Sequence, residues 1–297
     1  MGIDRPGDGD TPDDAPAGRA GPYAGPLSDP SARMAEQAWY RGTVEKVYAA
    51  ARDAWAEAVP GLRAAWAKHE QHYPERTRLA PRTQPDGSWV DGGNRELIPE
   101  HNAEAAKACA DTRDEGREIV LPAVRRVEAA DPGRRLAGLK NMLKGEDRLK
   151  EKIADYLRAP GVTVREALGM VPDAVRFTLT YSTERYADGV RADVERLTAE
   201  GFELMKLKNL WTNDQYKGIN SQWRRPETGL RVEMQFHTPE SLEAKELTHK
   251  AYERIRSSSV TSAERGEVED YQRRVNVLIA SPPGVAEIDD FPEKNDG

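Results

Sequence analysis

The stretch Val232-Glu233-Met234-Gln235-Phe236-His237-Thr238 decides how the chain folds, because its apolar and polar residues alternate. Alternation with a period of two is typical of a β-strand with one buried face, so we predict a strand over residues 230–238. Its polar face would present Glu233, Gln235 and His237 together, since residues two apart point the same way. A carboxylate, an amide and an imidazole in a row favour the floor of a functional site, although a surface strand with ordinary polar residues fits the same pattern.

Composition limits the class of protein to which the chain can belong. Its 297 residues are 38% hydrophobic and 32% charged, enough for one large domain or two ordinary ones, with no apolar run long enough to span a bilayer. The formal net charge of −7 argues against a general nucleic-acid coat, so we expect neither a membrane nor DNA as a partner. A local basic patch stays compatible with this charge.

The single cysteine and the polar N-terminus restrict redox chemistry and targeting. Cys109 has no partner for an internal disulfide and lies in an alanine-rich run, which predicts a small helix residue rather than a nucleophile. The N-terminus lacks the apolar core of a secretory signal, so we expect a cytoplasmic site of action. Export by another route is left open.

The first 130 residues predict a tail followed by a helical region. Residues 1–30 are rich in Gly, Pro, Asp and Ala, which predicts a disordered tail. Over residues 31–130 we expect a helix interrupted at Pro60, a second helix over 62–72, a loop or hairpin around Trp89-Val90, and a helix over 100–129. The aromatic stripe from Trp39 to Trp55 is expected to be core. This region would brace the rest of the chain, form an oligomer, or dock a delivery system or antitoxin.

Residues 134–158 form a basic amphipathic run that divides near Gly145. Lys144, Arg148 and Lys152 are spaced by four and would align if the helix were continuous. One interpretation is a cationic clamp for phosphates. The other is a solvated face whose charges are balanced by Glu146, Asp147, Glu151 and Asp155.

Strands and helices alternate from residue 171 onward. We predict strands over 171–181, 202–211 and 230–238, helices over 186–200, 241–256 and 263–279, and a flexible acidic tail over 281–297. Strands separated by helices, together with a hairpin turn at Pro226–Gly229, predict an α+β fold with a mixed β-sheet flanked by helices.

Two acidic residues lie on strands that we expect to be central, Asp173 and Glu233. Burying carboxylates is costly unless they have a partner, and a shared Mg²⁺ would provide one. A metal beside a cationic clamp suits phosphoryl transfer. Because no Walker loop, kinase glycine loop or Rossmann fingerprint is present, side chains would have to bind the phosphates. Tyr216 would either stack on a nucleobase or pack within the sheet.

In combination, four segments resemble the synthetase domain of the RelA/SpoT-type alarmone synthetases, and the resemblance spans residues 134–280. It is closest to actinobacterial ATP:nucleotide 3′-pyrophosphokinases and toxin-like small synthetases. It implies a nucleotidyltransferase-like fold and transfer of the β,γ-pyrophosphate of ATP to the 3′-hydroxyl of an acceptor nucleotide, with release of AMP. The segments are Asp173-Ala174-Val175-Arg176, Tyr216-Lys217-Gly218-Ile219-Asn220, Glu233–Thr238 and the pair His249 and Tyr252.

The resemblance also implies a role for each matching residue. Asp173 and Glu233 would hold Mg²⁺, and Glu233 would in addition activate the attacking hydroxyl. Positively charged residues would bind ATP, namely Lys144, Arg148, Lys152 and Arg176. The acceptor would contact Tyr216, Lys217, Asn220, Gln235 and His237.

Two departures from the family pattern concern the acceptor. Asn220 stands where alarmone synthetases usually have His, and His237 stands where they often have Arg. The acceptor would therefore be a guanosine or an adenosine nucleotide. One alternative is a toxin-type enzyme that modifies the 3′-end of tRNA, guided by Lys206, Lys208, Arg224 and Arg225. The other is a module that binds nucleotide without catalysis. No hydrolase module is expected in the N-terminal helices.

Overall fold

The computed structural model describes residues 30–74, 79–256 and 260–293. The chain divides into two compact units, Met1–Val44 and Glu45–Gly297. In the first unit the described part is the beginning of helix α1 (Pro30–His72), so the tail expected over residues 1–30 lies outside the described residues except for Pro30. The second unit contains the rest of α1 and all other described elements. None of the described helices is both long and apolar enough to cross a bilayer.

Helix α1 continues through Pro60, where the sequence predicted a break. The missing N–H of a proline removes one helical hydrogen bond, but here the residues on both sides of it are anchored. Trp55, Val59, Leu62 and Trp66 are buried in the main core. The expected aromatic core stripe is correct at Trp55 and wrong at Tyr40 and Val47, which are 61% and 59% exposed.

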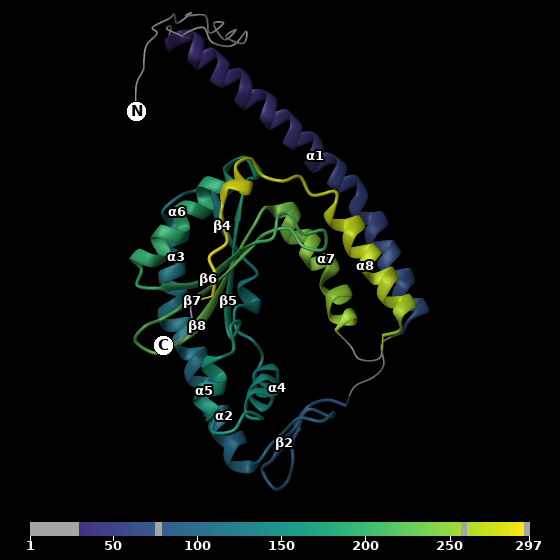
Figure 1. Cartoon of the computed structure of the whole chain (residues 1–297), viewed down its shortest axis with the longest axis vertical. Helices are drawn as coiled ribbons and strands as arrows, with labels where there is room; N and C mark the ends of the chain where they lie inside the picture. The colour runs from purple at the N-terminus through teal and green to yellow at the C-terminus, as the bar shows by residue number, and fades with distance from the viewer. Residues whose placement is uncertain (1–29, 75–78, 257–259, 294–297) are drawn as a thin grey trace, which may run out of the picture. The chain divides into compact units, whose positions relative to one another are not determined.

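A mixed five-stranded sheet forms the centre of the second unit within the described ranges (Figure 1). Its strands follow the order β4 (Arg134–Ala137), β5 (Val175–Tyr181), β8 (Arg231–His237), β7 (Ile219–Arg224) and β6 (Glu203–Asn209). Strands β5 and β8 are parallel, and all other neighbours are antiparallel. The predicted α+β class with a mixed sheet is therefore confirmed, and β8 lies at its middle.

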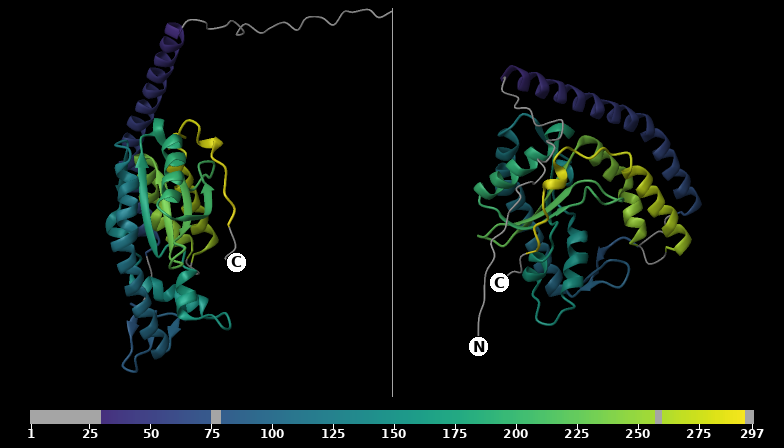
Figure 2. Two further views of the ribbon diagram at one scale, coloured as in Figure 1. Left: turned by 90° about the vertical axis from the view of Figure 1, so that its left-hand side faces the viewer. Right: turned by 45° about the horizontal axis from the view of Figure 1, so that its top comes forward.

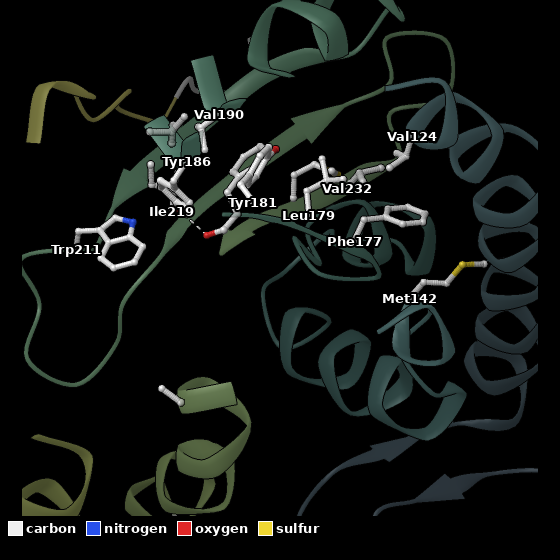
Figure 3. Packing of buried hydrophobic residues seen from close by; sticks show 14 of the residues in the cluster. Val124, Met142, Phe177, Leu179, Tyr181, Tyr186, Val190, Trp211, Ile219 and Val232 are labelled. Atoms are coloured by element: carbon white, nitrogen blue, oxygen red, sulfur yellow. Dashed lines mark hydrogen bonds between the residues drawn. The ribbon is translucent and has the colours of Figure 1, made fainter. Parts of the chain in front are cut away.

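The two faces of the sheet differ in polarity because neighbouring strands are in register. Phe177 lies opposite Met234, and Leu179 lies opposite Phe236, on an apolar face. Helices α3 (Leu121–Ala129) and α6 (Tyr186–Ala199) contribute Val124 and Val190 to the core that this face forms (Figure 3). Arg176 and Thr178 lie opposite Glu233 and Gln235 on the other face. Helices α7 (Pro239–Ile255) and α8 (Ser262–Asn276) lie on that side of the sheet (Figure 2).

A second, smaller core holds the helix that carries the basic residues. It combines helices α2 (Pro99–Glu115), α4 (Glu146–Tyr156) and α5 (Val164–Gly169) with a small antiparallel sheet. The strands of that sheet are β1 (Arg82–Thr83), β2 (Trp89–Val90) and β3 (Glu96–Leu97). Trp89 is buried, and its indole Nε1 donates to Asp147 Oδ1 at 2.9 Å. The segment expected to be a loop or small hairpin thus anchors the start of α4.

One π-helical turn and three 3₁₀ turns lie between the longer elements. The helix expected over 100–129 consists of α2, a π-helical turn η1 (Gly116–Val120) and α3. A Cβ at Gly116 would lie 2.9 Å from Leu143, so this glycine lets the helix approach the start of β5. Single 3₁₀ turns form η2 (Leu139–Asn141), η3 (Thr183–Arg185) and η4 (Val285–Glu287).

The segment after residue 281 corrects one expectation from the sequence. Its described part, up to residue 293, does not extend freely as a flexible tail. Leu207 and Phe291 exchange two backbone hydrogen bonds of 2.9 Å, and the Asn209 side chain donates to the carbonyls of Val285 and Ile288. The segment supplies partners to β6, which would otherwise be an unpaired edge of the sheet.

Residues 134–137 also correct the sequence analysis, because they form strand β4 rather than an amphipathic basic helix. The Arg134 side chain is 1% exposed, and its guanidinium lies 2.7 Å from the buried carboxylate of Asp193 in α6. Tyr181 donates its hydroxyl to the same carboxylate at 2.6 Å. Burial raises the pKa of Asp193, and Arg134 opposes this increase. Arg134 is therefore a structural cation and not part of a phosphate clamp.

Replacing Arg134 with Ala is expected to lower the free energy of unfolding by about 3–5 kcal/mol, because Asp193 would stay buried with its closest cation removed. Arg135→Ala serves as the control, since Arg135 is exposed and bonds only to backbone carbonyls. Its effect is expected to be within about 0.5 kcal/mol. Urea denaturation followed by circular dichroism measures both, and equal midpoints for the two variants would contradict a structural role for the pair.

Candidate functional site

Asp173 and Lys144 meet where two segments cross at the start of β5. The carbonyl of Ala174 accepts a hydrogen bond from the backbone N–H of Lys144 at 3.1 Å, which ties the segment before α4 to the segment before β5. Lys144 Nζ lies 2.6 Å from Asp173 Oδ2. Asp173 occupies the turn before β5. The sequence analysis expected it on a central strand, and this prediction is wrong. The turn leaves its carboxylate partly exposed at the edge of the polar face.

Glu233 lies in the middle of the polar face, between Arg176 on β5 and Gln222 on β7. Its Oε2 is buried and has no hydrogen-bond partner among the described residues, and the closest cation, Arg176 Nη1, is 3.9 Å away. Burial raises the pKa of Glu233, Arg176 opposes the increase, and the charge of Asp173 adds to it. A buried carboxylate oxygen without a partner is unusual in folded proteins, and a bound ion is one group that would satisfy it.

The two carboxylates suit one kind of metal. In the described ranges, no group of three or more His, Cys, Asp or Glu side chains is placed to bind an ion. Mg²⁺ needs fewer protein ligands, because it keeps several waters and shares carboxylates with substrate phosphates. The unpartnered oxygen of Glu233 and the nearby Asp173 therefore fit Mg²⁺.

The three predicted phosphate-binding cations before and within α4 do not form one stripe. Lys144 precedes the helix, which begins at Glu146, so the condition of a continuous helix is not met. Arg148 is 58% exposed, and Glu151 accepts from it at 3.0 Å. Lys152 is half-buried on the same helix. The hydrogen bond to Glu151 raises the pKa of Arg148, and the charge of Glu253 in α7 adds to this increase.

The acceptor-side residues form a chain of hydrogen bonds. Tyr216 donates its hydroxyl to Asn220 Oδ1 at 2.7 Å, and the same hydroxyl lies 2.9 Å from His237 Nε2. The other ring nitrogen of His237 lies 2.9 Å from Ser241 Oγ, in the first turn of α7. Tyr216 is half-buried. Its hydroxyl is held by Asn220 and His237.

His237 is completely buried, which changes its predicted role. Its ring lies edge to face with Tyr216 at 5.4 Å, so it would reach an acceptor only through Tyr216. Gly218 allows this arrangement, since a Cβ there would lie 2.7 Å from His237 Cε1. The sequence could have suggested this close approach from the glycine inside the Tyr216–Asn220 motif.

The remaining predicted residues divide between the site and its surroundings. Gln235 is buried on the polar face. Lys217 donates from Nζ to the carbonyl of Trp211 at 2.7 Å, and burial lowers its pKa.

The positive charges proposed to guide RNA are largely engaged in ion pairs. Lys206 lies 2.5 Å from Glu293, Arg224 lies 2.7 Å from Glu203, and Arg225 lies 3.3 Å from Glu115. His249 and Tyr252 are exposed on α7.

Lys245 was missed by the sequence analysis. It lies on α7 and donates from Nζ to Gln235 Oε1, so its ammonium group reaches the polar face next to Glu233. The run Glu243-Ala244-Lys245-Glu246 reads as an exposed helix face. The only signal in the sequence was the position of Lys245, two turns into the helix that directly follows β8.

No protein-family model matches the chain, and a comparison with curated proteins finds no match. Among solved structures, the chain is similar to small alarmone synthetase 1 from Bacillus subtilis bound to its product pppGpp. The identity is 14%, the alignment covers 59% of this chain and 93% of that one, and the TM-score is 0.43.

Two further structures show the same degree of likeness. A GTP pyrophosphokinase family protein from Streptococcus pneumoniae is 15% identical, with 60% and 87% of the two chains covered and a TM-score of 0.37. Small alarmone synthetase 2 from Bacillus subtilis is 13% identical, with 59% and 92% covered and a TM-score of 0.37. TM-scores below 0.5 do not establish a shared function, so a function must be supported by the residues of this chain.

The burial of His237 predicts a dependence of stability on pH. Burial lowers the pKa of His237 well below its usual range, so the folded protein binds this proton later than the unfolded chain does as pH falls. The contribution of His237 to stability is complete above pH ~6.5 and decreases as pH falls below that value, because the unfolded state then binds more protons. Urea denaturation at several pH values is expected to show this decrease.

In His237→Gln this position cannot titrate, so its free energy of unfolding is expected to fall less steeply below pH ~6.5 than that of the unmodified protein. The two slopes should differ by up to one proton, which is about 1.4 kcal/mol per pH unit. His249→Gln is the control, because His249 is exposed, and it should keep the slope of the unmodified protein. If the unmodified protein and both variants show the same pH slope of the free energy of unfolding, His237 is not held neutral in the fold.

Proposed function

We propose that this protein is a Mg²⁺-dependent nucleotide pyrophosphokinase, which transfers the β,γ-pyrophosphate of ATP to the 3′-hydroxyl of an acceptor purine nucleotide and releases AMP. One observation carries the proposal. The central strands place the unpartnered carboxylate oxygen of Glu233 beside Arg176, and the segments before β5 and α4 place Asp173 and Lys144 at the edge of the same polar face. Carboxylates for a metal and cations for phosphates are the groups that phosphoryl transfer requires.

Glu233 would act as the general base. Burial raises its pKa, which makes the carboxylate a better proton acceptor near neutral pH. It would accept the proton of the acceptor's 3′-hydroxyl as that oxygen attacks the β-phosphorus of ATP. The bond from the β-phosphorus to the bridging oxygen breaks, and AMP leaves with that oxygen. Asp173 and Glu233 would hold Mg²⁺, which when bound neutralises part of the phosphate charge.

Positively charged side chains would hold the ATP phosphates. Arg176 is adjacent to Glu233 across the β5–β8 pair, and Lys144 lies at the edge of the same face. Arg148 and Lys152 project from α4, the helix that the smaller core anchors. Lys144 pairs with Asp173, so ATP binding would require this lysine to exchange a carboxylate for a phosphate.

Tyr216 would stack on the acceptor base. Asn220 and His237 fix the hydroxyl of Tyr216, which leaves the ring in one orientation with its accessible part available to a ligand. Base–aromatic stacking is tolerant of the base, so this contact suits both guanosine and adenosine nucleotides. Gln235 and Lys217 lie nearby on the same side of Glu233.

Incubation with labelled ATP and Mg²⁺ and with GTP, GDP, ATP, ADP or AMP as acceptor is expected to yield AMP and a 3′-pyrophosphorylated nucleotide. Glu233→Gln and Asp173→Asn are each expected to reduce the rate at least ~100-fold, because they remove the base or a metal ligand. Chelation of Mg²⁺ should have a similar effect. Nucleotide separation by chromatography measures the products.

Glu195→Gln and Asp188→Asn are matched controls, since both residues are exposed on α6, away from the polar face. They should retain the unmodified rate. A parallel reaction with tRNA in place of free nucleotides tests the RNA acceptor. AMP release only with tRNA would exclude a free nucleotide as the acceptor, and ATP binding without AMP under any condition would exclude the enzyme.

Substitutions of Tyr216 are expected to separate stacking from anchoring. Tyr216→Ala should raise the KM for the acceptor by about 5- to 150-fold, the range that corresponds to the loss of one base–aromatic stack. Tyr216→Phe keeps the ring and loses the hydroxyl bonds to Asn220 and His237, so a smaller increase is expected. The KM for ATP should change little in both variants. If each variant changes the KM for ATP as much as the KM for the acceptor, Tyr216 lies outside the acceptor site.

A further inference from the structure

Lys245 is a largely buried cation without a charged partner. Its ammonium group donates to the neutral amide of Gln235, and no carboxylate lies within ion-pairing distance of it among the described residues. Burial, together with the nearby charge of Arg176, lowers the pKa of Lys245 to about 8, and the charge of Glu233 opposes both. Burying an ammonium group is costly unless an anion compensates it.

The position of Lys245 indicates where such an anion would bind. Along the parallel strands β5 and β8, the order is Asp173 before β5, then Glu233 beside Arg176, then Gln235, then His237 beneath Tyr216. Residues two apart on a strand are separated by about 7 Å. Lys245 contacts Gln235 and so lies between the proposed base and the aromatic ring, on the acceptor side of Glu233.

The hydrogen-bonding capacity of the group leaves room for a ligand. A lysine ammonium has three donors, and the bond to Gln235 uses one. Because Lys245 can only donate, it must face the amide oxygen of Gln235, which turns the amide NH₂ group toward the carboxylate of Glu233. The free donors of Lys245 and the guanidinium of Arg176, whose nearest carboxylate is 3.9 Å away, can then serve a common anion.

We propose that Lys245, together with Arg176, binds a phosphate group on the acceptor side of Glu233. This group is either the 5′-phosphate of the acceptor or the pyrophosphoryl group in transfer. The identity of the nucleotides rests on the proposed function, but the phosphate contact does not. A phosphate would supply the negative charge that the buried ammonium lacks, and charged hydrogen bonds of this kind are among the strongest in proteins.

Calorimetric titration of the full chain with inorganic pyrophosphate tests the contact without turnover. Lys245→Met is expected to weaken binding about 10- to 100-fold, the range for loss of a charge-assisted hydrogen bond, and Lys245→Arg should retain most of the affinity. Lys250→Met is the control, because Lys250 lies on the same helix, is 67% exposed and pairs with Glu70. Unchanged pyrophosphate binding in Lys245→Met would overturn the inference.

Steady-state kinetics with a nucleoside and with its 5′-mono- and diphosphate as acceptors then distinguish the two sources. If the acceptor phosphate is bound, Lys245→Met raises the KM of the phosphorylated acceptors and leaves the nucleoside unchanged. If the pyrophosphoryl group is bound, kcat falls for every acceptor and pyrophosphate affinity falls with it. Loss of activity with intact pyrophosphate binding would mean that Lys245 only orients Gln235, which contradicts the proposal. If Lys245→Met loses pyrophosphate binding and the unmodified protein forms no AMP, the proposed function is refuted and the phosphate contact stands.

Discussion

The structure depends on one constraint, which is that β8 has a strand on each side and must divide its side chains between two faces. Burial of Val232, Met234 and Phe236 in the main core turns Glu233, Gln235 and His237 to the opposite face. The hydrogen bonds of the strand are satisfied by β5 and β7, so only side chains remain available for chemistry. The Glu233 carboxylate held there loses water, and one of its two oxygens, Oε2, gains no hydrogen-bond partner among the described residues.

Charge on the polar face is compensated unevenly. Lys144 neutralises Asp173, whereas Arg176 is too distant to bond Glu233 well, and Lys245 has only an amide. Such a set of preorganised charges would be completed by the polyanionic ligand that we propose. The hydrogen-bonded chain from Ser241 through His237 to Tyr216 contributes rigidity rather than charge, because burial keeps the imidazole neutral.

The part of the N-terminal region from residue 45 onward braces the helices that flank this face. Trp89 and Arg95 bond to Asp147 and Asp155, which holds α4 at both ends. On the other side, Trp55 donates to Glu243 of α7 at 2.9 Å, and the ring of Trp66 lies 5.1 Å from that of Tyr271 in α8. The two helices are thereby positioned by residues far from the site in sequence.

Local periodicity alone determined the middle strand of the sheet, the helix α6, the mixed α+β class and the shared face of Glu233, Gln235 and His237. Periodicity shows which residues share a face but not what covers that face. Only the tertiary structure decided that Arg134 is buried against Asp193, that His237 lies beneath Tyr216 and that Lys245 enters the site from α7. Each of these depends on contacts between separate elements, and burial in those contacts, which a sequence pattern does not contain, determines how much each polar group is desolvated.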